Sequence, residues 1–355
     1  MKKAESSSPA LPLRTIRTPL HYFNALAGGI RWGALVELWG KSRSGKSGFA
    51  YQLAGNVFAD YPDAQATVLD PEGGYDPIRA KTAFGWRTDC VKSVQVPTLE
   101  EGFFCIAKIC KAIKTPHVIL WDTLSATPTA TSLKNLADSE GANKVSRFTA
   151  GQGDRQQIIK YHLRNLMSLT YGKPVIVLLP NQVYSEIGLF ARKEVPDNGY
   201  AFAHDVHYSF HFERIGDLGK GNYDVTGLVS DYVTEVSLAK SKFSPEFKSI
   251  CAFIDGKAGG RIDPELSLIL QAIKLGYLRD NSGWYPVLLE KDSVQKNLRW
   301  SDVILQKEVV SRQLLQIIQL DMIRNYPLIR LLYQELGWTE MLASLDASQS
   351  VPSKP

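Results

Sequence analysis

Long apolar runs are missing from this sequence, and no stretch of it has the length and apolar character of a membrane-spanning helix. The first residues also lack the layout of a signal peptide. Cysteine is scarce, and Cys90, Cys105, Cys110 and Cys251 show neither metal-ligand spacing nor a disulfide framework. We therefore expect a soluble protein of a reducing compartment, without a membrane partner.

The sequence also lacks a strong excess of either charge, since 41 Lys and Arg stand against 36 Asp and Glu. A net charge of +5 permits nucleic-acid binding through local patches but does not require it. An arginine-rich lid, which a small-molecule nucleotide kinase would need, is not evident. Composition therefore disfavours such a kinase and leaves the partner open.

The stretch from Ala34 to Phe58 has the pattern of a P-loop, G-x-x-x-x-G-K-[ST], placed between a short apolar strand and a helical repeat. Glycines allow backbone N–H groups to approach phosphate oxygens, and the helix N-terminus adds partial positive charge. We expect Lys46 to reach the β- and γ-phosphates of ATP and the Ser47 hydroxyl to bind Mg²⁺. The residues expected to bind nucleotide here are Gly40, Ser42, Arg43, Ser44, Gly45, Lys46 and Ser47.

Between residues 34 and 256, apolar strands alternate with segments of helical period, which predicts an α/β fold with a mostly parallel sheet covered on both faces. The expected strands are 34–39, 66–70, 117–122, 175–180, 205–214, 232–240 and 249–255. The expected helices are 46–59, 99–113, 154–171 and 265–275, with a hairpin at 281–286 and further helices to about 345. We expect an N-terminal arm (1–24), an ATPase core (25–262), a small α+β C-terminal domain (263–345) and a disordered tail (346–355).

Three polar residues follow predicted strands and would face the same crevice. Asp122 ends the run HVILWD and is expected to hold Mg²⁺ through water. Glu72 is a candidate acceptor for a proton from the water that attacks the γ-phosphate, although a solvated turn carboxylate is an equal alternative from the residues alone. Gln182 follows VIVLLPN, where its amide can respond to the γ-phosphate.

Three histidines, His204, His207 and His211, raise the possibility of a metal site. Strand alternation accounts for them better, because it places His207 and His211 on one face and Tyr208, Phe210 and Phe212 on the other. We therefore favour a half-buried strand.

The order of these motifs resembles the bacterial RecA and phage UvsX recombinases over about residues 20 to 290. The segments that carry the resemblance are GKSRSGKS, LDPEGGYDPIRA, VILWDT, LPNQ, AKSKFSPEFK and GYLRDNSGWY. The resemblance implies that Glu72 is the catalytic glutamate and Gln182 the switch glutamine. It further implies that Lys240 and Lys242 reach across a subunit interface to the neighbour's ATP, and that the protein acts in the cytoplasm of a bacterial or phage-infected cell.

Two long, glycine-bearing segments, 139–154 and 184–204, would be the DNA-binding loops by the same resemblance. The expected DNA contacts are Lys144, Arg147, Phe148, Arg192 and Lys193. The alternative is that both are ordinary surface loops.

The sequence also departs from the family pattern. Asp76 stands at the position of the family's adenine-contacting aspartate, whereas Arg79 replaces its adenine-stacking tyrosine. A guanidinium plane can also stack on a base, which leaves the base preference open. The N-terminal arm is shorter than the family's polymerising segment, and no acidic C-terminal tail is present.

We therefore expect an ATPase that uses ATP and Mg²⁺, forms helical filaments on single-stranded DNA, and pairs it with double-stranded DNA in strand exchange. The alternatives are a ring-forming, helicase-like motor with the same core and a recombinase-regulating paralogue.

Overall fold

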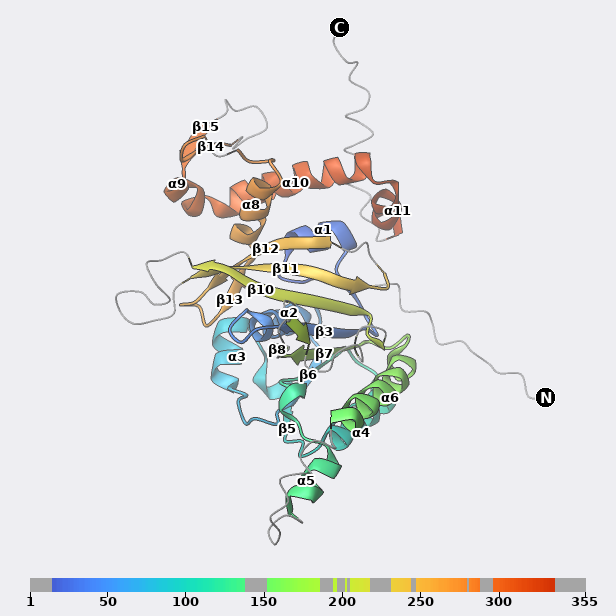
Figure 1. The fold of residues 1–355 in the computed structure, drawn as a ribbon. Coiled ribbons are helices and arrows are strands. Elements are labelled where there is room, and N and C mark those ends of the chain that lie inside the picture. The colour runs from blue at the N-terminus through green and yellow to red at the C-terminus, as the bar shows by residue number, and fades with distance from the viewer. Residues whose placement is uncertain are drawn as a thin grey trace, which may run out of the picture.

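A sheet of nine strands forms the centre of the molecule (Figure 1). The computed structural model describes residues 15–137, 152–185, 194–196, 202, 205–217, 231–243, 247–279, 281–287 and 296–335. The sheet order is β13-β12-β11-β10-β3-β7-β6-β4-β5. Its strands are β3 (Leu35–Gly40), β4 (Gln65–Leu69), β5 (Val91–Val94), β6 (His117–Trp121), β7 (Val175–Asn181), β10 (Tyr208–Asp217), β11 (Tyr232–Ser241), β12 (Phe247–Asp255) and β13 (Arg261–Asp263).

The direction of the strands divides the sheet into two parts. From β10 through β3, β7, β6 and β4 to β5 every neighbouring pair is parallel. From β10 through β11 and β12 to β13 the pairs are antiparallel. The central strands β6 and β7 are buried along their whole length, which explains their continuous apolar sequence. The α/β fold with a mostly parallel sheet is therefore as the sequence predicts.

Helices cover both faces of the parallel part. On one face, α2 (Lys46–Asp60) and α3 (Pro77–Phe84) pack on side chains such as Val36, Val68 and Phe210. On the other face, α4 (Leu99–Ala112) and α6 (Gln152–Thr170) pack on Leu35, Ile119 and Val177. Neighbouring residues of one strand, such as Leu35 and Val36, therefore pack into the hydrophobic cores on opposite faces of the sheet.

A third hydrophobic cluster unites the C-terminal elements with the helix α1 (His21–Ala27). Its elements are α8 (Pro264–Lys274), β14 (Trp284–Val287), β15 (Lys296–Arg299), α9 (Trp300–Leu305), α10 (Lys307–Asn325) and α11 (Pro327–Glu335). The Tyr333 hydroxyl donates a hydrogen bond to the carbonyl of Ala25 at 2.6 Å. Helix α1 spans the boundary that the sequence analysis places between the N-terminal arm and the core, after residue 24.

The remaining elements are short. Strand β1 (Thr15–Ile16) pairs with β2 (Ile30–Arg31), and β8 (Val183–Ser185) with β9 (Glu194–Pro196). The sequence analysis predicted neither these strands nor α1, α3, β5 and α5 (Ala130–Ala137), whereas every strand and helix that it placed between residues 34 and 275 is present within a few residues. No helix among the described residues has the length and apolarity to cross a membrane.

Candidate nucleotide-binding site

Four polar segments meet at one edge of the sheet. Strands β3, β4, β6 and β7 are parallel, so the loops that follow them lie at the same edge. These loops carry the P-loop, Glu72, Asp122 and Gln182. Ligands of open α/β sheets bind outside this edge.

The P-loop depends on one left-handed glycine and on two close backbone approaches. Gly45 caps α2 with a left-handed φ of 97°. A Cβ on Gly40 would lie 2.2 Å from the carbonyl oxygen of Phe212, and one on Gly48 would lie 2.3 Å from that of Gly260. Glycine is therefore needed here for packing against β10 and the 256–260 loop, as well as for access to phosphate.

Lys46 lies at the start of α2, with its ammonium group inside the loop. Nζ donates to the carbonyl oxygens of Gly40 at 2.7 Å and Lys41 at 2.6 Å. Burial lowers the pKa of Lys46 to about 8, against the opposing effect of Asp122. These neutral carbonyls are contacts that a phosphate oxygen can replace, because the anion binds an ammonium group more strongly.

Ser47 and Asp122 form the predicted metal-binding pair. The Ser47 hydroxyl lies 3.4 Å from Oδ1 of Asp122, within reach of a hydrogen bond. Burial raises the pKa of Asp122 to about 6, and the Ser47 hydroxyl acts in the opposite direction. A hydroxyl and a carboxylate are the oxygen donors that Mg²⁺ prefers. Ser44 Oγ is also buried and makes no hydrogen bond within the described residues, so the loop fits a bound phosphate and its metal.

Glu72 lies beside this pair because two neighbours position its loop. Oε1 of Glu72 accepts a hydrogen bond from Thr123 Oγ1 at 2.9 Å. Asp70 accepts from the backbone N–H groups of Gly74 at 3.0 Å and Tyr75 at 2.9 Å. The charges of Glu72 and Asp70 both act to raise the pKa of Asp122.

Gln182 follows β7 with an exposed side chain. Its backbone N–H donates to Ser125 Oγ at 3.0 Å, and Ser125 Oγ donates to Oδ1 of Asn181 at 2.8 Å. This hydrogen bond ties the end of β7 to the loop after β6, which carries Asp122.

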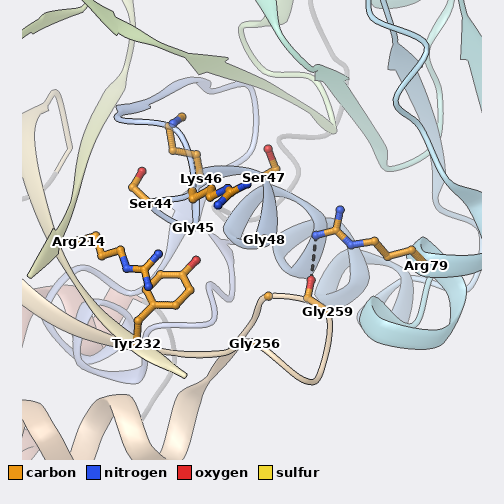
Figure 2. Close-up of a pocket in the computed structure, with 12 residues that line it drawn as sticks. Ser44, Gly45, Lys46, Ser47, Gly48, Arg79, Arg214, Tyr232, Gly256 and Gly259 are labelled. Atoms are coloured by element: carbon orange, nitrogen blue, oxygen red, sulfur yellow. Dashed lines mark hydrogen bonds between the residues drawn. The ribbon is translucent and has the colours of Figure 1, made fainter. Parts of the chain in front are cut away.

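A cavity of about 360 Å³ opens beside the P-loop (Figure 2). Arg79 lines one wall and donates from Nη2 to the carbonyl of Gly259 at 2.8 Å. The opposite wall is Tyr232, with the Arg214 guanidinium 4.1 Å from its ring centre. The sequence analysis missed Arg214 and Tyr232. They reach the site only because β10 lies next to β3, which no local pattern reveals.

Asp76 has a structural task at this wall. Its Oδ1 accepts from the backbone N–H groups of Ile78 at 2.8 Å and Arg79 at 3.2 Å, so the carboxylate caps α3. The other predicted loop residue near the cavity, Arg43, lines it with a left-handed φ of 62°.

Lys240 and Lys242 lie toward the opposite end of the strands from the P-loop of their own subunit. Strand β11 runs antiparallel to β10, which is parallel to β3, so the end of β11 lies at the edge where β3 begins. The backbone N–H of Lys242 donates to the carbonyl of His207 at 3.0 Å at that edge. The ordering of the strands therefore separates the lysine pair from the P-loop that precedes it in sequence.

The histidines of β10 and its approach take part in packing. Leu35 N–H donates to Nδ1 of His207 at 3.0 Å, and burial lowers the pKa of His207 to about 4. The ring of His211 stacks on Trp39 at 3.9 Å. Across the described ranges, no group of three or more His, Cys, Asp or Glu side chains is arranged to hold a metal ion. His204 and the predicted DNA contacts Lys144, Arg147, Phe148, Arg192 and Lys193 lie outside those ranges.

The fold is a mixed α/β fold with a large, mostly parallel sheet flanked by helices, which is consistent with a RecA-like core. No family model matches the chain. The chain is 29% identical over 259 residues to the protein RecA of Saccharopolyspora erythraea, covering 73% of this chain and 69% of that one. It is 28% identical over 259 residues to RecA of Nocardia farcinica (73% and 69% covered) and 26% over 269 residues to RecA of Dichelobacter nodosus (74% and 70%). These similarities support a relationship with the RecA family.

Proposed function

We propose that the protein is a phage-type RecA-like recombinase, an ATPase that assembles into filaments on single-stranded DNA and drives pairing and strand exchange with double-stranded DNA. The observation that carries the proposal is the position of two sets of residues at opposite edges of the sheet. The P-loop, Glu72 and Asp122 lie at one edge, and Lys240 and Lys242 at the other. Stacked subunits would bring the lysine edge of one against the P-loop edge of the next.

In this mechanism Glu72 accepts a proton from the water that attacks the γ-phosphate, and Thr123 holds the carboxylate in place. Lys46 leaves the carbonyls of Gly40 and Lys41 to bind phosphate oxygens. Mg²⁺ held by Ser47 and Asp122 would neutralise phosphate charge. Lys240 and Lys242 supply further positive charge from the neighbour, which is useful only when the subunits are stacked.

Gln182 would link this chemistry to DNA. It lies at the start of the segment that continues into 184–204, and its backbone is tied to the loop after β6. DNA binding itself is assigned to the two predicted loops, with Lys144, Arg147, Phe148, Arg192 and Lys193 as the expected contacts. The proposed site of action is the cytoplasm of a bacterial or phage-infected cell.

The base end of ATP would lie along the wall formed by Arg79 and Gly259 (Figure 2). Arg79 extends over the rings of Tyr51 and Phe84, at 5.9 and 5.6 Å from their centres, which holds its guanidinium plane. A planar cation can stack on any base. The phosphates would then supply most of the binding energy.

Negative-stain imaging with single-stranded DNA and a slowly hydrolysed ATP analogue tests the proposal. We expect helical filaments for the parent protein and far fewer for the Lys240→Ala/Lys242→Ala double variant. A matched control is Lys274→Ala, which removes a cation that pairs with Glu235, in β11 but away from its C-terminal end. Rings would favour the helicase-like motor, and single particles without DNA dependence would contradict the proposal.

A further inference from the structure

Glu37, in the strand that leads into the P-loop, is a carboxylate buried in the sheet with 1% of its surface exposed. Oε1 accepts a hydrogen bond from Asn181 Nδ2 at 3.0 Å, and Oε2 accepts one from Ser209 Oγ at 2.7 Å. Ser209 Oγ in turn accepts from Trp39 Nε1 at 3.1 Å. Ionisable groups are rarely buried so completely unless they have partners, and burial has a cost that an apolar residue would avoid.

The hydrogen-bond path continues from Glu37 toward the nucleotide edge. Oδ1 of Asn181 accepts a hydrogen bond from Ser125 Oγ at 2.8 Å. Ser125 Oγ in turn accepts a hydrogen bond from the backbone N–H of Gln182 at 3.0 Å. A shift of Gln182 would therefore move Ser125, then Asn181, and then the carboxylate. Three hydrogen bonds connect the switch position with the middle of β3.

On its other side, the path reaches the strand that carries Lys240. Ser209 and Lys240 are partners in the β10–β11 register. Lys240 Nζ is buried and makes no hydrogen bond among the described residues. The charges of Glu37 and Asp205 favour its ammonium form, whereas burial and Lys242 lower its pKa. The charge of Glu37 therefore acts on Lys240, which is the register partner of the serine that donates to the Glu37 carboxylate.

We propose that Glu37 is a positioning residue that couples Gln182 of a subunit to Lys240 of the same subunit. The inference rests on the proposed function. In a stack, Gln182 senses the subunit's own nucleotide while Lys240 faces the neighbour's. Glu37 thereby couples two consecutive ATP sites through the sheet of one subunit. This coupling would act in addition to contacts across the interface between subunits.

The surroundings of Glu37 suit this coupling. Burial raises the pKa of Glu37 to about 7, against the hydrogen bonds from Ser209 and Asn181 and the charge of Lys240. The charged and titratable groups nearest the Lys240 side are Asp205, Lys242 and His207. From Asn181 onward the path consists of side chains on four adjacent strands, β7, β3, β10 and β11, while Ser125 lies in the turn after β6.

The experiment compares parent, Glu37→Gln and Ser125→Ala in single-stranded DNA-stimulated ATP hydrolysis, with rates measured against ATP concentration. Glu37→Gln keeps the shape and one acceptor oxygen, but it removes the charge and puts an amide donor in place of the second acceptor. Ser125→Ala breaks the path near Gln182. The control is Gln271→Met in α8, which loses a buried hydrogen bond from the backbone of Cys251, away from the path. ATP affinity without DNA and the thermal unfolding midpoint are measured for each.

We expect a Hill coefficient above one for the parent and near one for Glu37→Gln and Ser125→Ala. The DNA-stimulated rate of both variants should fall by about tenfold, while ATP affinity stays within about twofold of the parent. Gln271→Met should lower the unfolding midpoint without reducing the Hill coefficient. If both path variants keep the parent's Hill coefficient, the coupling is wrong although the recombinase proposal stands. A parent without DNA-stimulated hydrolysis would overturn both.

Discussion

Thr123 and Glu72 form the contact at which the proposed chemistry can be tested most simply. The Thr123 hydroxyl donates to the carboxylate at 2.9 Å, so it orients the proton acceptor without taking its charge. We predict that Glu72→Gln lowers ATP turnover by about 10²–10⁴-fold, because only the proton acceptor is lost. Nucleotide affinity, measured by equilibrium titration, should remain close to that of the parent.

Thr123→Val provides the matched comparison. It removes the orienting hydroxyl but leaves the carboxylate, so turnover should fall less than in Glu72→Gln. Parent-level turnover in Glu72→Gln would show that this residue is a solvated turn carboxylate, the alternative that the sequence left open.

The protonation of Glu37 gives a second prediction, on stability. Its pKa in the folded protein is about 7, above the ordinary value of 4.5, because of burial. Between these two values the unfolded chain has lost the proton and the folded chain retains it. Glu37 therefore makes the protein less stable as pH rises from about 4.5 to 7, by at most about 3 kcal/mol, and adds no further change above that range.

The measurement is the free energy of unfolding of Glu37→Gln minus that of the parent, across this pH range. This difference in the free energy of unfolding should become more positive as pH rises, because only the parent loses stability through Glu37. His117 and His207 oppose the trend in both proteins, because burial lowers the pKa of each to about 4, and they cancel in the difference. A difference that does not vary with pH would contradict the assigned environment of Glu37.

At the scale of elements, the contact between α4 and β6 determines where Asp122 is held. A Cβ on Gly102 in α4 would lie 2.3 Å from the ring of Trp121, the residue before Asp122. Trp121 is buried, and its Nε1 donates to Thr127 Oγ1 at 3.0 Å, so the ring has little freedom to move. We predict that Gly102→Ala destabilises the protein by about 1–3 kcal/mol and also weakens ATP hydrolysis.

Urea unfolding provides the measurement. The control is Gly216→Ala in β10, where an added Cβ meets no atom within 4 Å. Equal midpoints for the two variants would mean that α4 yields to the extra methyl group without cost.

The elements themselves were largely predictable, because the signals for them are local. Strands such as β6 and β7 are continuous apolar runs, and α2 follows a glycine-rich turn. The short helix α3 was missed, although Asp76 and Pro77 are a cap and a first-turn residue. The sequence analysis considers Asp76 only as an adenine contact and does not use its capping signal.

At the scale of the whole molecule, the sequence shows the edge of the sheet for only some of the site residues. The P-loop, Glu72, Asp122 and Gln182 were placed together because strand ends of a parallel sheet share an edge. Arg214 and Tyr232 were not, since their place in the cavity depends on β10 lying beside β3 and β11 beside β10. The same strand order puts Lys240 toward the opposite edge. The proposal that ATP hydrolysis requires lysines from a second subunit can therefore be tested.

Mixing two inactive variants on single-stranded DNA tests the central claim, that one ATP site takes residues from two subunits. A Lys46→Ala subunit retains Lys240 and Lys242 for its neighbour, and a Lys240→Ala/Lys242→Ala subunit retains its own P-loop. Each variant alone should hydrolyse ATP at least about 10²-fold more slowly than the parent, because it lacks charge at the transferring phosphate. Their mixture should regain a substantial part of the parent's DNA-stimulated ATPase. A mixture that forms mixed filaments but stays as inactive as either variant alone would contradict the account.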